Sequence, residues 1–245
     1  MKGVILAGGL GTRLYPLTYA TNKHLLPVFN KPMIYYPIQT LVNAGINEIL
    51  IVVSGPHSGH FINVLKNGKE VGIKHLEYAY QEKANGGIAD ALALAEDFAD
   101  KQPIAVILGD NTTDADISEA VKKFKEGALV FLKKVKDPHR FGVARFDLKN
   151  KEKIIEIIEK PKNPPSDLAV TGLYIYDKQV FDFIKNCDPD YIGRGELEIT
   201  QVNNFYINKQ MLHWSELDGH WLDAGTFETL LAANQYWAKK LTKIN

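Results

Sequence analysis

The stretch VILAGGLGTRL (Val4–Leu14) joins a short apolar run to a glycine-rich turn. The apolar part, residues 4–7, predicts a short buried strand, and three glycines follow it within four positions. Glycine adopts positive φ freely and lets a bound group approach the backbone. A glycine-rich turn that leaves a strand is therefore a natural cradle for phosphate oxygens, because its main-chain N–H groups act as donors. Arg13, just past the glycines, adds a fixed positive charge with forked donors.

Two common phosphate-binding loops do not fit this stretch. The P-loop needs Gly-Lys-Ser/Thr after four intervening residues, and this chain has no such sequence here. The dinucleotide fingerprint would start at Gly9 and Gly11 and would then need a small residue where Leu14 stands. On these residues alone, an ordinary tight turn between strand and loop, with no bound phosphate, is an alternative to a phosphate-binding loop.

Two further segments favour the phosphate-binding interpretation over an ordinary turn, KHLLP (Lys23–Pro27) and KPMIYYP (Lys31–Pro37). Together with GGLGTRLYPLT (Gly8–Thr18) they resemble, in the same order, the sugar nucleotidyltransferases, and most closely the glucose-1-phosphate thymidylyltransferases. The resemblance extends from Met1 to about Leu241. It implies that Arg13 and Lys23 neutralise charge during transfer. It also implies that the nucleotide's phosphates are held by the loop residues Gly8, Gly9, Gly11, Thr12 and Arg13.

Composition limits the class of protein. The 245 residues suit one large α/β domain, and the formal net charge of zero without a long basic block does not indicate a nucleic-acid surface. The single cysteine, Cys187, excludes an internal disulfide and fits a reducing cytosol. No stretch approaches the ~20 apolar residues of a membrane helix. We expect a cytoplasmic protein that binds neither membranes nor nucleic acids.

Strands and helices alternate in the first half of the chain. We expect strands at residues 4–7, 48–53, 73–80 and 103–108, with helices at 34–44 and 88–98. This alternation predicts an α/β fold with a doubly wound, mostly parallel sheet, and ligands in such sheets bind beyond the carboxyl ends of the strands. The resemblance implies a Rossmann-like nucleotidyltransferase fold.

From Ala128 the pattern changes to strands with little helix between them. We expect these strands, which we interpret as antiparallel additions that cover the far side of the pocket, at residues 128–135, 141–147, 153–159 and 170–176. Helices at 180–185, 196–207 and 227–241 and a strand near 212–214 complete the expected elements. We interpret residues 1–245 as one domain, with the nucleotide-binding part at about 1–127 and the sugar-binding additions at about 128–220.

Two aspartates are candidate metal ligands, Asp110 after the strand at 103–108 and Asp223 in WLDAGT (Trp221–Thr226). Taken alone, an aspartate in such a place is more often a helix cap or a turn residue. LGDN (Leu108–Asn111) and WLDAGT resemble the two metal-binding segments of the family. The resemblance implies that Asp110 and Asp223 hold Mg²⁺, and that Asp110 acts in catalysis with Arg13 and Lys23. Such a site suits Mg²⁺, which binds few carboxylates together with waters and phosphate oxygens.

The remaining nucleotide contacts resemble the family's base-reading stretch, here QEKANGGIA (Gln81–Ala89). Gln81 can offer a donor and an acceptor to a pyrimidine edge, although a surface glutamine at a strand end is the simpler interpretation without the resemblance. The stretch is one residue longer than the commoner family spacing. Both Gly86 and Gly87 therefore stay candidates for the residue that approaches the base.

The sugar side resembles the family at FGV (Phe141–Val143), EKP (Glu159–Pro161), AVTG (Ala169–Gly172) and GELEIT (Gly195–Thr200). The resemblance implies that Lys160 holds the sugar's phosphate and that Glu159 accepts hydrogen bonds from its hydroxyls. Asn111, Gly142, Val170 and Trp221 are the other candidate sugar-phosphate contacts. Thr112-Thr113 and Gln201 depart from the usual pattern, which bears on fine specificity rather than on the reaction.

These features predict a Mg²⁺-dependent enzyme that joins dTTP and glucose 1-phosphate by direct in-line attack. A uridylyltransferase, or an enzyme for another sugar 1-phosphate, is the main alternative. A nucleotide-sugar-dependent glycosyltransferase would use Asp114-Ala115-Asp116 as its Asp-x-Asp, although a helix N-terminus explains that triplet better. A non-catalytic nucleotide-sugar sensor is a further alternative. His24 and Cys187 stand in no recognisable nucleophile arrangement, so no covalent intermediate is expected.

The expected partners are two small molecules, a nucleoside triphosphate and a sugar 1-phosphate. Longer relatives carry an additional C-terminal helical region that contributes to subunit contacts and to a regulatory nucleotide site. We expect this chain to lack that region. A homo-oligomer is therefore one possible assembly, and we do not infer the feedback regulation of the longer relatives for this chain.

Overall fold

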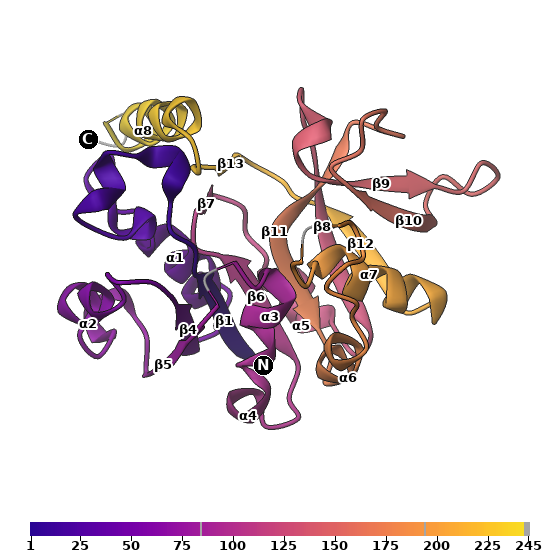
Figure 1. Ribbon diagram of the computed structural model, residues 1–245, viewed down its shortest axis with the longest axis horizontal. Helices are drawn as coiled ribbons and strands as arrows, with labels where there is room; N and C mark the ends of the chain where they lie inside the picture. The colour runs from indigo at the N-terminus through magenta and orange to yellow at the C-terminus, as the bar shows by residue number, and fades with distance from the viewer. Residues whose placement is uncertain (84, 194, 243–245) are drawn as a thin grey trace.

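The structure, a computed structural model, describes residues 1–83, 85–193 and 195–242. Its centre is a nine-stranded mixed sheet in the order β10-β9-β11-β6-β1-β4-β5, with β8 beside β11 and β12 beside β8 (Figure 1). The strands of this sheet are β1 (Lys2–Ala7), β4 (Glu48–Val53), β5 (His75–Tyr80), β6 (Ile104–Leu108), β8 (Ala128–Lys134), β9 (Gly142–Phe146), β10 (Ile154–Glu159), β11 (Leu168–Tyr176) and β12 (Leu212–Glu216).

The parallel half of the sheet is built around β1. This strand pairs in parallel with β4 on one side and β6 on the other, and β4 continues in parallel to β5. Val4 and Ile5 are completely buried because both faces of the strand are covered. Successive side chains alternate between two cores, since Leu6 packs into one apolar cluster and Ala7 into the other. The predicted buried strand and the mostly parallel sheet are confirmed.

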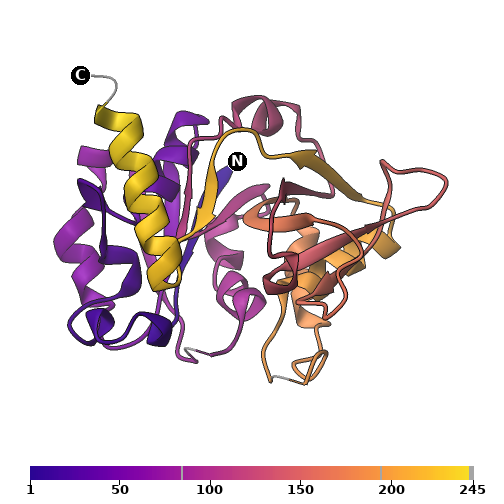
Figure 2. The same cartoon turned by 90° about the horizontal axis from the view of Figure 1, so that it is seen from above.

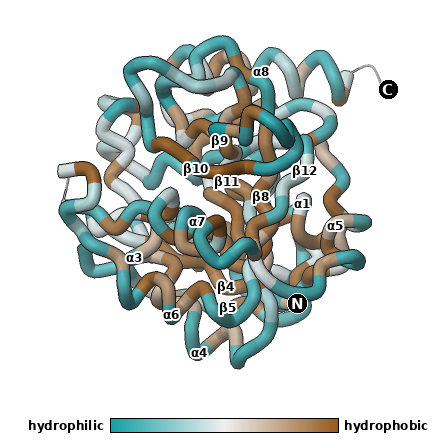
Figure 3. Tube along the Cα trace, turned by 90° about the vertical axis from the view of Figure 1, so that its right-hand side faces the viewer, coloured by the Kyte–Doolittle hydropathy of each residue, from teal (hydrophilic) through white to brown (hydrophobic). Residues whose placement is uncertain are grey.

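Helices cover both faces of the sheet. The core on one face includes α3 (Ile88–Ala93), α4 (Glu96–Ala99), α6 (Gln179–Lys185) and α7 (Ile199–Asn208). The core on the other face includes α1 (Tyr35–Asn43), α2 (Gly59–Leu65) and α5 (Ser118–Lys123). Apolar residues gather accordingly along the strands inside, and polar residues along the outer turns (Figure 3). In the described part of the chain, none of the helices has the length and apolar character needed to span a membrane.

The last helix, α8 (Phe227–Thr242), lies beside the segment that follows the glycine-rich loop, as two perpendicular views show (Figures 1 and 2). Leu230 and Trp237 of α8 pack against Leu14 and Tyr36 in a third apolar cluster. The short hairpin of β2 (Pro27–Val28) and β3 (Lys31–Pro32) adds Val28 to this cluster. The end of the chain therefore supports the loop that carries Arg13.

The second half of the chain extends the sheet with antiparallel strands, as predicted. β11 runs antiparallel to β6 and to β8, and β9 pairs antiparallel with β10 and with the start of β11. β12 differs, since it runs parallel to β8. These strands and α7 form the part of the molecule that faces the glycine-rich loop across the sheet edge (Figure 1).

Two predicted helices have different bounds in the structure. The helix expected at 196–207 begins only at Ile199, because Glu198 is extended and the backbone of Leu197 is engaged elsewhere. Leu197 N donates to Gly86 O at 2.8 Å, and Leu197 O accepts from Ala89 N at 3.0 Å. The helix expected at 88–98 is interrupted, so that α3 and α4 are separate.

Two three-residue strands were not anticipated, β7 (Asn111–Thr113) and β13 (Trp221–Asp223). They pair antiparallel with Asp223 opposite Asn111. This pairing brings the LGDN and WLDAGT segments together, although they are about 110 residues apart in the chain.

Candidate active site

A cavity of about 390 Å³ opens at the carboxyl ends of β1 and β6. Residues from the glycine-rich loop, from KHLLP, from the base-reading stretch and from the segments that resemble the metal and sugar sites contribute to its wall. The predicted site residues that line it are Gly8, Gly9, Arg13, Lys23, Gln81, Gly87, Asp110, Asn111, Gly142, Glu159, Lys160, Val170, Trp221 and Asp223. Three predicted nucleotide contacts, Gly11, Thr12 and Gly86, are described by the structure but lie outside this lining.

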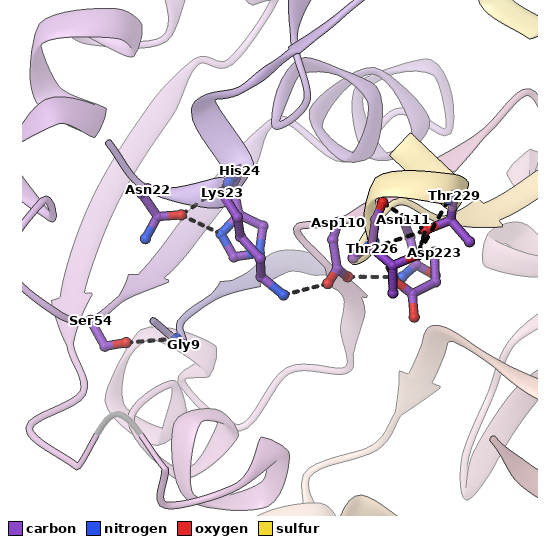
Figure 4. Close-up of polar contacts among 11 residues, drawn as sticks. Gly9, Asn22, Lys23, His24, Ser54, Asp110, Asn111, Asp223, Thr226 and Thr229 are labelled. Carbon is purple, nitrogen blue, oxygen red and sulfur yellow. Dashed lines mark hydrogen bonds and ion pairs between the residues drawn. The ribbon is translucent and has the colours of Figure 1, made fainter. Parts of the chain in front are cut away.

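The glycine-rich loop is held by hydrogen bonds to neighbouring segments. Gly9 N donates to Ser54 Oγ at 2.8 Å (Figure 4), and Thr18 Oγ1 donates to Gly11 O at 2.8 Å. A Cβ at Gly8 would lie only 2.8 Å from Gln81 Oε1. Because Gly8 has no side chain, Gln81 can approach the loop backbone at this position. Gly11 therefore supports the shape of the loop, whereas Gly8 and Gly9 face the cavity.

Lys23 and Asp110 form an ion pair at the centre of the site. Lys23 Nζ lies 2.5 Å from Asp110 Oδ2, and their side chains are only 14% and 10% exposed (Figure 4). Asn111 Nδ2 also donates to Asp110 Oδ1 at 3.3 Å. Burial opposes the charge of Asp110, but the positive charge and hydrogen bond of Lys23 hold the pKa of this carboxyl below its ordinary value. Asp110 is thus an ionised carboxylate in a largely buried position.

Asp223 lies beside this pair through the β7–β13 contact. Its Oδ1 accepts a hydrogen bond from Gly225 N at 2.8 Å. A Cβ placed on Gly225 would lie 2.7 Å from Asp223 Oδ1, 3.0 Å from Arg13 Nη2 and 3.6 Å from Asp110 Oδ2. Two carboxylates and a guanidinium therefore converge on one point. Burial and the nearby charge of Asp110 raise the pKa of Asp223.

This donor set fits a hard divalent cation such as Mg²⁺. Two carboxylates converge, and within the described ranges no cluster of three or more His, Cys, Asp or Glu residues is placed to hold a metal. Mg²⁺ binds through one or two carboxylates and completes its shell with waters and substrate phosphates. A closed structural zinc site would instead need four protein ligands.

His24 and Cys187 are not arranged as nucleophiles. His24 is 1% exposed, and its Nδ1 lies 2.7 Å from Asn22 Oδ1, the atom that also accepts from His24 N. Burial and the adjacent Lys23 lower the pKa of His24 to about 3, so the ring is neutral. Although it lines the cavity, the ring packs against Gly109, where a Cβ would lie 2.7 Å from His24 Cδ2. Burial raises the pKa of the Cys187 thiol to about 11.

The opposite wall of the cavity carries the predicted sugar contacts. Glu159 Oε2 accepts from Thr200 Oγ1 at 2.6 Å, and Lys160 Nζ lies 3.2 Å from Glu159 Oε1. Asn111 Oδ1 accepts from Trp221 Nε1 at 2.6 Å and from Gly172 N at 3.1 Å. The Lys160 side chain is 41% exposed, so a further cation faces the cavity from the side opposite Arg13 and Lys23.

Comparison with known proteins decides the family. The sequence pattern of the nucleotidyl transferase family matches residues 2–240. The chain belongs to this family. A glucose-1-phosphate thymidylyltransferase from Neisseria gonorrhoeae is 42% identical over 243 residues, which span 96% of this chain and 82% of that protein. One from Xanthomonas campestris pv. campestris (strain B100) is 42% identical over 241 residues, which span 96% and 80%. The resemblance inferred from the motifs is confirmed.

Solved structures agree with this nucleotidyltransferase assignment. A Bacillus anthracis protein assigned to the glucose-1-phosphate thymidylyltransferases, crystallised with sucrose, superposes with a TM-score of 0.89 at 49% identity. That match covers 96% of this chain and 94% of the other. A UDP-glucose pyrophosphorylase complexed with UDP-glucose superposes with a TM-score of 0.82 over 98% of both chains, and its 24% identity supports the fold alone.

Several cavity residues of this nucleotidyltransferase were not among the predicted site residues. They include Arg140, Tyr174, Glu198, Thr200 and Asn203. Glu198 and Thr200 belong to the GELEIT motif, so the motif was the available signal. Arg140 follows Pro138 in a short turn, and no pattern in the sequence marks it.

The Asp-x-Asp triplet has structural roles away from the cavity. Asp116 Oδ1 accepts from Ser118 N at 2.8 Å at the start of α5, which confirms the predicted helix N-terminus. Asp114 Oδ1 instead accepts from His220 N at 2.6 Å, and its Oδ2 contacts Tyr236 and Lys240 of α8. Neither aspartate is among the residues lining the described cavity, so the glycosyltransferase interpretation gains no support.

Proposed function

We propose that this nucleotidyltransferase joins dTTP to α-D-glucose 1-phosphate and releases dTDP-glucose and pyrophosphate. About 42% identity to thymidylyltransferases over 96% of the chain supports this reaction. One observation carries the site assignment, the convergence of Asp110, Asp223 and Arg13 beside the glycine-rich loop. The reaction brings two anions together, and the cavity presents cations from both walls.

Each wall of the cavity is proposed to bind one substrate. The loop backbone at Gly8 and Gly9, together with Arg13 and Lys23, binds and orients the triphosphate. Gln81 and Gly87 contact the base. On the opposite wall Lys160 binds the phosphate of the sugar, and Glu159, held by Thr200, accepts hydrogen bonds from its hydroxyls. Positioning and charge neutralisation are then the main catalytic contributions.

Asp110 and Asp223 are the proposed ligands of Mg²⁺. When bound, the ion would add positive charge to the phosphate oxygens and so stabilise the charge that develops during transfer. Asp110 remains ionised because Lys23 pairs with it, and Asp223 stays hydrogen-bonded to Gly225 N, which orients its other oxygen. The cytoplasm, rich in nucleoside triphosphates, is the proposed location of the enzyme.

We expect one in-line displacement, with inversion of configuration at the α-phosphorus. The phosphate of glucose 1-phosphate is already an anion near neutral pH, so no general base is required, and neither His24 nor Cys187 is set up as a nucleophile. The product formed from a chiral α-thiotriphosphate of thymidine reports the stereochemistry. Retention would require a covalent intermediate and would contradict the direct mechanism.

We also expect the kcat/KM for UTP to lie at most about 10- to 200-fold below that for dTTP, and the value for CTP to be much lower. The two preferred bases differ by one methyl group, and a difference of this size is worth ~1–3 kcal/mol in a binding pocket. Initial rates of pyrophosphate release with each nucleotide and glucose 1-phosphate measure the preference. A clear preference for CTP or for a purine nucleotide would refute the assignment, and nucleotide binding without any turnover would favour the sensor alternative.

A further inference from the structure

The amide of Gln81 has a fixed orientation in this site. Its Nε2 donates to Asp90 Oδ2 at 2.7 Å and to Gly87 O at 3.2 Å. Carboxylate and backbone carbonyl oxygens accept hydrogen bonds, so the nitrogen of the amide faces them. The contacts themselves therefore distinguish the nitrogen from the oxygen of this side chain.

The oxygen of the same amide faces the other way. Gln81 Oε1 lies beside Gly8, where a Cβ would be 2.8 Å from it, and both residues line the cavity. The Gln81 side chain is almost completely buried, with 4% of the residue exposed. Among the described residues none donates a hydrogen bond to Oε1. This edge of the cavity thus offers a ligand an acceptor and no donor from Gln81.

Asp90 is itself held in place by the shape of its surroundings. It lies in the first turn of α3 (Ile88–Ala93), directly after the glycine pair. A Cβ on Gly86 would lie 2.2 Å from Asp90 Oδ2, so the absence of a side chain at position 86 makes room for this carboxylate. Of the two glycines, Gly87 lines the cavity and Gly86 accommodates Asp90.

We propose that Asp90 is a positioning residue for base specificity, because it holds the Gln81 amide with its oxygen toward the nucleotide. This inference rests on the proposed function, in which Gln81 contacts the base. Thymine and uracil carry an N–H donor at N3 that Oε1 can accept. Cytosine has an unprotonated N3, so its ring nitrogen would face Oε1 as a second acceptor. The pair Gln81–Asp90 therefore admits dTTP and UTP and excludes dCTP and CTP.

The test is the effect of Asp90→Asn on the ratio of kcat/KM for dTTP to kcat/KM for dCTP. Asparagine keeps the size of Asp90 but can donate through its own amide, which allows Gln81 to turn and present Nε2 to the base. We expect the ratio to fall by about tenfold or more, because the buried acceptor Gln81 Oε1 no longer has to face the unprotonated N3 of cytosine. The value for dCTP should rise, while the value for dTTP should fall.

Two further variants make the result specific. Asp97→Asn, the same change at an exposed position in α4, should leave the ratio at the wild-type value. In a Gln81→Met background, Asp90→Asn should not change the ratio further, because no amide remains to be oriented. An equal loss of activity with both nucleotides in Asp90→Asn would indicate a merely structural role and would overturn the proposal.

The same proteins distinguish this inference from the proposed function. Failure of the wild type to release pyrophosphate from dTTP and glucose 1-phosphate would refute the function. Dissociation constants for dTTP and dCTP, measured by calorimetry on the wild type and on Asp90→Asn, would still decide the role of Asp90. A wild type that binds the two nucleotides equally, or a ratio of constants that Asp90→Asn leaves unchanged, would overturn it.

Discussion

Asp110→Asn is expected to lower kcat with dTTP and glucose 1-phosphate by about 10²- to 10³-fold, the range typical for the loss of one electrostatic group at a reaction centre. Asparagine keeps the size of the side chain but removes the charge that pairs with Lys23 at 2.5 Å and faces Asp223 across Gly225. Mg²⁺ would then be held by one carboxylate instead of two. Lys23, 14% exposed, would lose its counterion, so the melting temperature should fall as well.

A magnesium titration separates binding from chemistry. If Asp110 and Asp223 hold the ion, excess Mg²⁺ should recover part of the kcat lost in Asp110→Asn or Asp223→Asn. Asp116→Asn is the matched control, because Asp116 is exposed and only hydrogen-bonds Ser118 at the start of α5. Full activity at low Mg²⁺ in either active-site variant would remove that aspartate from the proposed metal site.

The elements that the sequence predicted correctly carry a local signal. The run at residues 4–7 is completely apolar or small, which is typical of a parallel strand covered on both faces. Asp110 follows such a strand after one glycine, so its place at a carboxyl end could be inferred without knowing the rest of the fold. The position of this strand and of the aspartate at a carboxyl end could therefore be predicted from the residues alone.

The elements that were missed depend on contacts between distant segments. β7 and β13 have three residues each, too few for any periodic pattern, and they exist because they pair with one another. Their pairing is what sets Asp223 beside Asp110. Likewise, Arg140 and Asn203 reach the cavity only because β9 and α7 lie against the parallel half of the molecule.

The late start of α7 has the same origin. Residues 196–198 have a helix-compatible pattern, but the backbone of Leu197 is hydrogen-bonded to Gly86 and to Ala89. A tertiary interaction thus overrides the local preference for a helix. This contact also explains why the sequence could not distinguish the two adjacent glycines of the base-reading stretch. Gly87 lies directly against Leu197, and Gly86 against the side chain of Asp90.

Gly87→Ala is accordingly expected to disable nucleotide binding. Gly87 has a φ of 95°, and a Cβ there would lie 2.4 Å from Leu197 O and 2.7 Å from Leu197 N. These are backbone atoms held by two hydrogen bonds, so they cannot move aside as a flexible side chain would. We expect a loss of about 2–5 kcal/mol in the free energy of unfolding, from backbone strain and overpacking together.

The backbone that Gly87→Ala displaces includes Gly87 O, which accepts a hydrogen bond from Gln81 Nε2. The KM for dTTP should therefore rise by about 10²-fold, a loss equivalent to ~3 kcal/mol of binding. Gly45→Ala is the matched control. Gly45 has a similar φ of 83°, but a Cβ there meets open space, so only the strain of about 1–2 kcal/mol is expected and the KM should not change. Urea unfolding and initial rates compare the two variants. If Gly87→Ala loses no more stability than Gly45→Ala and keeps its KM for dTTP, the contact with Leu197 does not shape the nucleotide site.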